Sequence, residues 1–126
     1  VVYGKPADAA DAGRMLRTLS GRTHRCISSV WLVSAGREAH ASCVSEVRVE
    51  PLDEAMVAAY VATGECFGKA GAYAIQGRFG AHVAHLSGSY TGVMGLPLHE
   101  TAATVATACV RRPASSVWRS LCQRFP

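Results

Sequence analysis

The sequence lacks several features that would assign it to a specialised class of protein. Its five cysteines include no C-x-x-C spacing, and an odd count does not suit a complete set of disulfides. This argues against a zinc site and against a secreted disulfide framework, and it favours free thiols in a reducing compartment. No apolar run approaches the roughly 20 residues that span a bilayer, and no signal-peptide pattern is visible. We therefore expect a cytoplasmic protein with no membrane partner.

Charged residues are also scarce, at 17% of the 126 residues, whereas 49% of the residues are hydrophobic. This composition argues against a disordered chain and suits one folded domain that buries most of its apolar surface. The formal net charge is +4, and the basic residues are scattered, with Arg111 and Arg112 as the one adjacent pair. A solvated surface explains this charge better than a nucleic-acid interface, which ranks last among the candidate functions.

The histidines do not indicate a metal site. His82-x-x-His85 has a metal-like spacing, but on a strand these two side chains would point to opposite faces. His24, His40 and His99 have no partner at metal-ligand spacing. No serine or cysteine shows the surroundings of an activated nucleophile, so the residues alone do not favour covalent catalysis.

The pattern of apolar residues predicts a mixed α/β order of helix, hairpin, helix, strand and helix. Helices are predicted over residues 7–20, 54–63 and about 98–109. Strands are predicted over residues 25–34, 41–50 and 79–87. The first two strands form a β-hairpin, and the second has one wet face. Asp53 is placed as the N-cap of the second helix, and residues 88–92 are expected to form a loop.

One glycine-rich region favours ligand binding. More than half of the 12 glycines lie between Gly68 and Gly95. Within this region, Lys69 is a cation of the kind that binds phosphate, and glycines let the backbone approach an anion. The amide of Gln76 can both donate and accept, as the reading of a base edge requires. From the residues alone, two interpretations stay open: a nucleotide-binding loop, or turn glycines beside a solvated lysine.

Three segments, taken together and in order, resemble the Maf family of nucleoside triphosphate pyrophosphatases. They are Gly4-Lys5-Pro6 with the helix that ends Leu19-Ser20-Gly21-Arg22-Thr23-His24, then Lys69-Ala70-Gly71-Ala72-Tyr73-Ala74-Ile75-Gln76-Gly77, and then Gly88-Ser89-Tyr90 with Gly95-Leu96-Pro97-Leu98. The match runs from residue 1 to about residue 105. The resemblance implies the mixed α+β fold shared with inosine-triphosphate pyrophosphatases, with a long sheet and a cleft between two lobes.

The same resemblance implies a reaction and its participants. A nucleoside triphosphate would be hydrolysed between its α and β phosphates, with a divalent metal that is usually Mg²⁺. The chain looks like the branch of the family that acts on the pyrimidine nucleotides dTTP and UTP. By resemblance, Lys5 is the catalytic residue that remains and contacts phosphate. Lys69 also contacts phosphate, Gln76 helps to select the base, and Tyr73 belongs to the substrate-binding loop. No metal ligand is assigned.

The sequence departs from the family pattern in three places. Family members carry a Ser-x-Ser-Pro-Arg-Arg segment and an Ala-Asp-Thr segment whose Asp is the general base, and neither is present here. Gly68 stands where the family usually has Asp before Lys-Ala-Gly. We therefore interpret residues 1–110 as the C-terminal two thirds of an N-terminally truncated Maf-like domain, and residues 111–126 as a tail of uncertain structure.

These departures affect the expected activity and assembly. Loss of a positioned general base typically costs about 10²- to 10⁴-fold in rate, so this chain is expected to be a weak or inactive enzyme. The alternative is a non-catalytic remnant that binds a nucleotide weakly or pairs with another chain. An incomplete sheet would expose an edge that invites such pairing, which predicts a homodimer.

Overall fold

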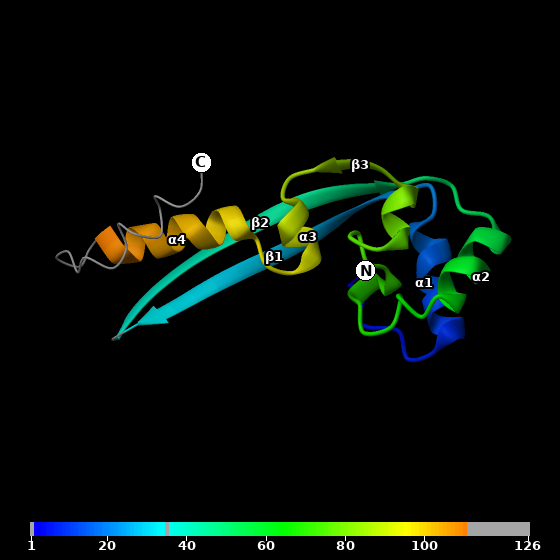
Figure 1. Ribbon diagram of the computed structural model, residues 1–126, viewed down its shortest axis with the longest axis horizontal. Helices are drawn as coiled ribbons and strands as arrows, with labels where there is room; N and C mark the ends of the chain where they lie inside the picture. The colour runs from blue at the N-terminus through cyan, green and yellow to red at the C-terminus, as the bar shows by residue number, and fades with distance from the viewer. Residues whose placement is uncertain (1, 35, 111–126) are drawn as a thin grey trace.

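The computed structural model describes residues 2–34 and 36–110, and side chains as far as Ala108. Over these residues the chain has the predicted mixed α+β fold, with an antiparallel sheet of three strands and four α-helices (Figure 1). The elements in chain order are α1 (Ala9–Leu19), β1 (Thr23–Ser34), β2 (Arg37–Val49), α2 (Glu54–Ala62), the 3₁₀ turns η1 (Ala70–Ala72) and η2 (Arg78–His82), β3 (Val83–Ser87), α3 (Tyr90–Met94) and α4 (Leu98–Val110).

The sheet consists of a long hairpin with a short third strand, in the order β1-β2-β3. The ladder between β1 and β2 runs without a register shift from the pair Thr23 and Arg48 to the pair Ser34 and Arg37. In contrast, β3 pairs with β2 only at the end near Val49, where the register is irregular. The predicted hairpin is confirmed, and both of its strands are longer than expected.

Helices α1 and α2 form where their capping residues and apolar faces predict them. The Asp8 carboxylate accepts a hydrogen bond from the backbone N–H of Asp11, and Asp53 accepts one from Met56 over 2.7 Å. Such N-caps are worth about 1 kcal/mol each. In α2, Val57 and Tyr60 are buried, as the spacing of its apolar residues requires.

The hydrophobic core lies at one end of the hairpin. There α1, α2 and the segment from Ala72 to Phe79 pack against β2. The buried cluster comprises Ala12, Met15, Leu16, Leu19, Val47, Val49, Val57, Tyr60, Cys66, Ala72, Tyr73, Ile75 and Phe79. Each large apolar side chain that is fully buried there contributes about 1.5–3 kcal/mol.

Two predicted elements are wrong in part. The strand expected over residues 79–87 begins only at Val83, because residues 78–82 form η2. A β-carbon on Gly80 would lie 2.6 Å from the carbonyl oxygen of Ile75, so this turn is packed too tightly for an ordinary strand residue. The expected loop over residues 88–92 contains the start of α3, whose N-cap Ser89 accepts from the N–H of Gly92. The predicted tail lies outside the described residues.

The far half of the hairpin is covered on one face only. Helices α3 and α4 pack on this inner face, where Ser28 donates to the carbonyl of Gly92 over 2.6 Å (Figure 1). The outer face stays in solvent, which confirms the wet face expected for β2. Exposed apolar side chains on this outer face are Ile27 at 69%, Trp31 at 60%, Val33 at 65% and Val44 at 54%.

No helix in the described part of the chain is long and apolar enough to cross a bilayer.

Candidate functional site

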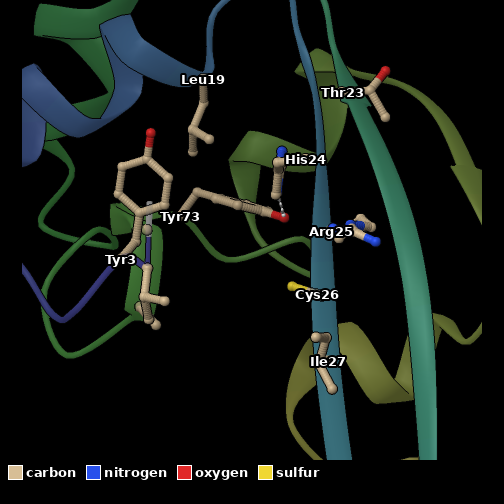
Figure 2. A pocket seen from close by; sticks show the side chains of 11 residues that line it. Tyr3, Leu19, Thr23, His24, Arg25, Cys26, Ile27 and Tyr73 are labelled. Atoms are coloured by element: carbon tan, nitrogen blue, oxygen red, sulfur yellow. Dashed lines mark hydrogen bonds between the residues drawn. The ribbon is translucent and has the colours of Figure 1, made fainter.

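An open cavity of about 590 Å³ lies between the N-terminal segment and the first half of β1. Figure 2 shows Tyr3 and Tyr73 on one side and β1 on the other, with His24 and Cys26 on the strand. Leu19, at the end of α1, also lines the cavity. Successive side chains of a strand point to opposite faces. His24 and Cys26 are two residues apart, so they share the inner face of β1.

Tyr73 and His24 form the central contact of this cavity. The Tyr73 hydroxyl lies 2.8 Å from His24 Nε2, and the two rings meet edge to face (Figure 2). Burial raises the pKa of the Tyr73 hydroxyl and lowers the pKa of the His24 imidazole. Both groups are therefore neutral near pH 7, and the contact is a hydrogen bond between neutral partners.

The other ring nitrogen of His24 is unsatisfied. Nδ1 is buried and has no hydrogen-bond partner among the described residues. A buried polar atom without a partner typically costs about 1–3 kcal/mol. His24 therefore depends on Tyr73 for its only protein hydrogen bond in the described part of the chain.

Cys26 does not have the properties of a reactive thiol. Burial is the main influence on the thiol and raises its pKa, while a hydrogen bond with Tyr73 acts in the opposite direction. Activated cysteines instead have lowered pKa values and lie beside cations or helix N-termini. The inner face of β1 thus presents neutral groups to the cavity, while Arg25 is the one cationic side chain among the cavity's lining residues.

The lysines predicted from the sequence lie on two loops that touch each other. The backbone N–H of Gly71 donates to the carbonyl of Gly4 over 3.1 Å. This bond joins the turn that carries Lys5 to the loop that carries Lys69. Both lysine side chains are exposed, and neither forms an ion pair within residues 2–34 and 36–110. The structure therefore brings the two predicted phosphate contacts to neighbouring loops.

The loop after Lys69 has an unusual backbone. Gly71 has a φ of 74°, and the following Ala72 has a φ of 61°, in the left-handed region. An alanine in that region costs of order 1 kcal/mol, and such strain is concentrated at functional sites. The Ala72 N–H donates to the Lys69 carbonyl over 3.1 Å, which helps to hold this turn. The strained backbone supports a functional role for the Lys69 loop.

Gln76 lies at the exposed tip of a well-anchored segment. Before it, the N–H of Ala74 donates to the Tyr60 hydroxyl over 3.1 Å. After it, the N–H of Arg78 donates to the Glu65 carboxylate over 2.8 Å. The backbone on both sides of Gln76 is therefore anchored, while its side chain is exposed.

The predicted site residues do not all surround one cavity. Tyr73 lines it, whereas Lys5, Lys69 and Gln76 are exposed and are not among its lining residues. Their assigned roles stay predictions. Sequence reasoning missed His24, of which it said only that no partner lies at metal-ligand spacing. The alternation of β1 indicated its face, but no sequence signal indicated a contact with Tyr73, 49 residues later.

The residues that the structure describes do not build a metal site of their own. No group of three or more His, Cys, Asp or Glu side chains comes together within the described ranges. The carboxylates nearest in sequence to the lysine loops already have partners, because Asp8 accepts from the backbone N–H of Asp11 and Glu65 accepts from that of Arg78. Mg²⁺ prefers free carboxylate oxygens, water and substrate phosphates.

Comparison with known proteins finds one matching family and several relatives that share one name. The profile of the family described as Maf-like protein matches residues 1–108. A dTTP/UTP pyrophosphatase of Ralstonia nicotianae is 59% identical over 86% of this chain and 53% of its own length. Proteins with the same name from a Polaromonas species and from Xanthomonas euvesicatoria are 54% and 60% identical, over 80% and 79% of this chain. The chain spans about half the length of these relatives.

Proposed function

The chain belongs to the Maf-like protein family, and on this basis we propose that it serves in a nucleoside triphosphate pyrophosphatase that acts on dTTP and UTP. The reaction would release the nucleoside monophosphate and pyrophosphate. The name shared by relatives at 54–60% identity supports this assignment. The family match also confirms the resemblance drawn from the sequence.

The observation that carries the proposal is the backbone bond between Gly71 and Gly4. It holds the Lys5 turn against the Lys69 loop, so two exposed cations lie on adjoining loops beside a glycine-rich backbone. Cations and backbone N–H groups placed in this way suit a polyanionic triphosphate. In the proposed complex, Lys5 and Lys69 bind phosphate oxygens as point charges.

Gln76 is proposed to select the base. Its amide offers a donor and an acceptor, and a pyrimidine edge presents both kinds of group. The anchoring of Ala74 and Arg78 on either side positions the backbone from which the amide extends. Tyr73 contributes by positioning this segment through its bond to His24.

Phosphoryl and nucleotidyl transfer depends mainly on positioning and on charge stabilisation. The lysines can supply part of that charge, and Gln76 can orient the nucleoside. A divalent ion would have to be held mainly by the triphosphate, since the described residues build no site for it. Because Asp8 and Glu65, the carboxylates nearest in sequence to the lysine loops, already accept backbone hydrogen bonds, we propose that turnover by these 126 residues is slow.

The test is nucleotide binding and pyrophosphate release with dTTP, UTP, ATP and GTP in the presence of magnesium. Hydrogen bonds to charged groups are worth about 1.5–3 kcal/mol, so Lys69→Ala is expected to weaken dTTP binding by about tenfold or more. The matched control, Arg48→Ala, removes an exposed cation on the hairpin and should change binding by less than about twofold. Equal losses in both variants would contradict the proposed phosphate contact.

Base selection needs a separate comparison. Gln76→Ala is expected to reduce the preference for dTTP and UTP over ATP and GTP, with little change in binding of the triphosphate group. Gln76→Glu keeps the shape but removes the donor, and it should impair the same preference. If all four nucleotides bind equally to the unmodified chain, the proposed pyrimidine specificity is wrong.

A second candidate function is nucleotide binding without catalysis. The lack of a described carboxylate in the cavity lining favours it. Saturable binding of dTTP without release of pyrophosphate above buffer would support this candidate. Measurable release that depends on Lys5 would favour the enzyme.

The free thiols of Cys26, Cys43 and Cys66 support a reducing setting, and we include a cytoplasmic location in the proposal.

A further inference from the structure

Two side chains at the end of α2 hold the segment that carries Gln76. The Tyr60 hydroxyl accepts a hydrogen bond from the backbone N–H of Ala74 over 3.1 Å, and the Glu65 carboxylate accepts one from that of Arg78 over 2.8 Å. Tyr60 lies in the last turn of α2, and Glu65 follows just after the helix ends. The end of α2 therefore holds the backbone on both sides of the exposed Gln76.

The position of Glu65 is itself defined by the way α2 ends. Gly64 has a φ of 76° and ends the helix in the left-handed conformation. The N–H of Glu65 donates to the Thr63 hydroxyl over 3.2 Å, and that hydroxyl donates to the Tyr60 carbonyl over 2.6 Å. The Glu65 side chain is 30% exposed. Its carboxylate therefore extends from a hydrogen-bonded turn and is partly enclosed.

Gly77 makes room for this carboxylate. A β-carbon added at Gly77 would lie 2.3 Å from Glu65 Oε2, far inside van der Waals contact. Gly77 has a φ of −96°, which any residue adopts without strain, so its backbone conformation does not require glycine. The missing side chain serves the close approach of Glu65 instead. The carboxylate thus lies directly beside the residue that follows Gln76.

The bond to the backbone matters more than the ion pair that Glu65 also forms. Glu65 Oε1 lies 3.7 Å from Arg78 Nε, and the Arg78 side chain is 76% exposed. Exposed ion pairs of this kind contribute little. A hydrogen bond from a backbone N–H to a carboxylate is stronger than one between neutral groups, because the acceptor is charged. Glu65 therefore acts chiefly on the path of the chain after Gln76.

We propose that Glu65 is a positioning residue for base selection, since its carboxylate holds the backbone from which the Gln76 amide reaches the base. This inference rests on the proposed function, in which Gln76 selects a pyrimidine nucleotide. Glu65 acts through the Arg78 N–H and not through contact with the nucleotide. Recognition groups must be held within about 0.5 Å of their productive geometry. A loosened segment therefore loses discrimination between bases while the lysines still bind phosphate.

The first measurement is amide hydrogen exchange of the complete 126-residue chain without nucleotide. Glu65→Ala is expected to accelerate exchange of the Arg78 N–H about tenfold or more, because this N–H loses its acceptor. The matched control is Glu54→Ala, which removes a carboxylate paired with Arg17 at the start of α2. The control should leave Arg78 exchange unchanged. Unchanged exchange in Glu65→Ala overturns the proposal, whatever the chain binds.

The second measurement compares the dissociation constants of dTTP, ATP and inorganic triphosphate in the presence of magnesium. Glu65→Ala is expected to reduce the preference for dTTP over ATP about fivefold or more. Binding of inorganic triphosphate should change less than about twofold, because Lys5 and Lys69 stay in place. General damage to the fold would weaken all three ligands together. An equal loss for all three would therefore contradict a role in base selection.

Two further variants separate the hydrogen bond from the charge. Glu65→Gln keeps an oxygen that can accept from the Arg78 N–H, and it should retain the dTTP preference within about twofold. Gly77→Ala leaves Glu65 in the chain but displaces its carboxylate, and it should reproduce the loss seen in Glu65→Ala. The two losses should not add in the double variant, since both act through one bond. Additive losses would count against that shared contact.

Failure of the proposed function and failure of this inference give different results. If the unmodified chain binds dTTP no better than ATP, the proposed pyrimidine specificity is wrong, and the role of Glu65 in base selection is wrong with it. If the unmodified chain prefers dTTP and Glu65→Ala keeps that preference, the positioning inference alone is wrong.

Discussion

Tyr73 and His24 illustrate how one hydrogen bond holds together parts of the chain that are far apart in sequence. The Tyr73 hydroxyl is the one partner of the His24 ring among the described residues, and it lies 2.8 Å from Nε2. Because Tyr73 begins the segment that leads to Gln76, this bond connects that segment, with the amide proposed to select the base, to β1. A change at either residue should therefore lower the stability of the fold and, as a smaller effect, shift the position of Gln76.

The first prediction concerns this hydroxyl. Tyr73→Phe leaves both nitrogens of a half-buried imidazole without a protein partner, and the expected loss is about 1–3 kcal/mol of unfolding free energy in urea. Tyr3→Phe is the control, since the Tyr3 hydroxyl forms no hydrogen bond within the described ranges and its loss should cost less than about 0.5 kcal/mol. Equal costs for the two variants would show that the Tyr73–His24 bond contributes nothing to stability.

The second prediction concerns pH. Burial lowers the pKa of His24 below its ordinary value of 6.5, so the unfolded chain takes up this proton at a higher pH than the folded chain does. The contribution of His24 is thus fully present above pH 6.5 and is lost as the pH falls from 6.5 towards the lowered pKa. The carboxyl groups of Asp11 and Glu54 also have lowered pKa values, but their loss begins below 4.5, outside this range.

The measurement is the free energy of unfolding between about pH 7.5 and about pH 5.5. The native chain should lose stability across this range, and His24→Leu should show a smaller slope whatever its absolute stability. An identical slope in the variant would mean that His24 is not the titrating group.

At the scale of the element, local signals predicted those parts of the fold that local chemistry decides. Helix α1 begins two residues after its predicted start and α2 begins at the predicted residue, because Asp8 and Asp53 cap them. The hairpin was predictable because β-branched and alternating residues fill both strands. Residues 78–82 were mistaken for strand because Gly80 packs against the Ile75 carbonyl, a tertiary contact that no periodicity reveals.

The candidate site, like the fold, was predictable in part from the sequence. The Lys5 and Lys69 segments were selected from the sequence, and the Gly71–Gly4 bond places them together. The cavity was not predicted, since its lining combines the N-terminal segment, the end of α1, the start of β1 and the loop at residues 70–73. The start of α3 was also missed, because its N-cap Ser89 stands beside Gly88 in what reads as a loop.

The third prediction tests the connection between α3 and the sheet. Gly88 has a φ of 111°, and a β-carbon there would lie 2.9 Å from Ser45 Cα. Gly88→Ala is expected to cost about 2 kcal/mol or more in unfolding free energy, from backbone strain and overpacking together. Gly64→Ala serves as the control, because Gly64 has a φ of 76° but no atom within 4 Å of the added carbon. It should show the strain cost alone, about 1 kcal/mol. A smaller loss for Gly88→Ala than for Gly64→Ala would refute this packing argument.

At the scale of the whole molecule, the core and the cover of the sheet are unevenly distributed. The buried cluster lies at the Val47 and Val49 end of β2, while α3 and α4 cover only the inner face of the far half. The outer face of the hairpin therefore presents apolar side chains to solvent over much of its length. Contiguous apolar area of this kind promotes association between molecules.

The fourth prediction follows from this exposed face. Val33 is 65% exposed, so Val33→Thr should change the free energy of unfolding by less than about 0.5 kcal/mol. The same change should raise the concentration at which the chain begins to aggregate, as measured by light scattering. Ala106→Thr in α4, another exposed position, should leave aggregation unchanged. Equal behaviour of the two variants would place the aggregating surface elsewhere.

The hairpin also governs the order in which the chain folds. β1 and β2 meet across a turn of a few residues, so their long ladder forms with little loss of loop-closure entropy. Tyr73 reaches His24 only after the chain has closed over 49 residues. The folding nucleus is thus expected in the hairpin, with the Tyr73 contact added after the transition state. Losing the Tyr73 hydroxyl should then accelerate unfolding and leave the folding rate almost unchanged.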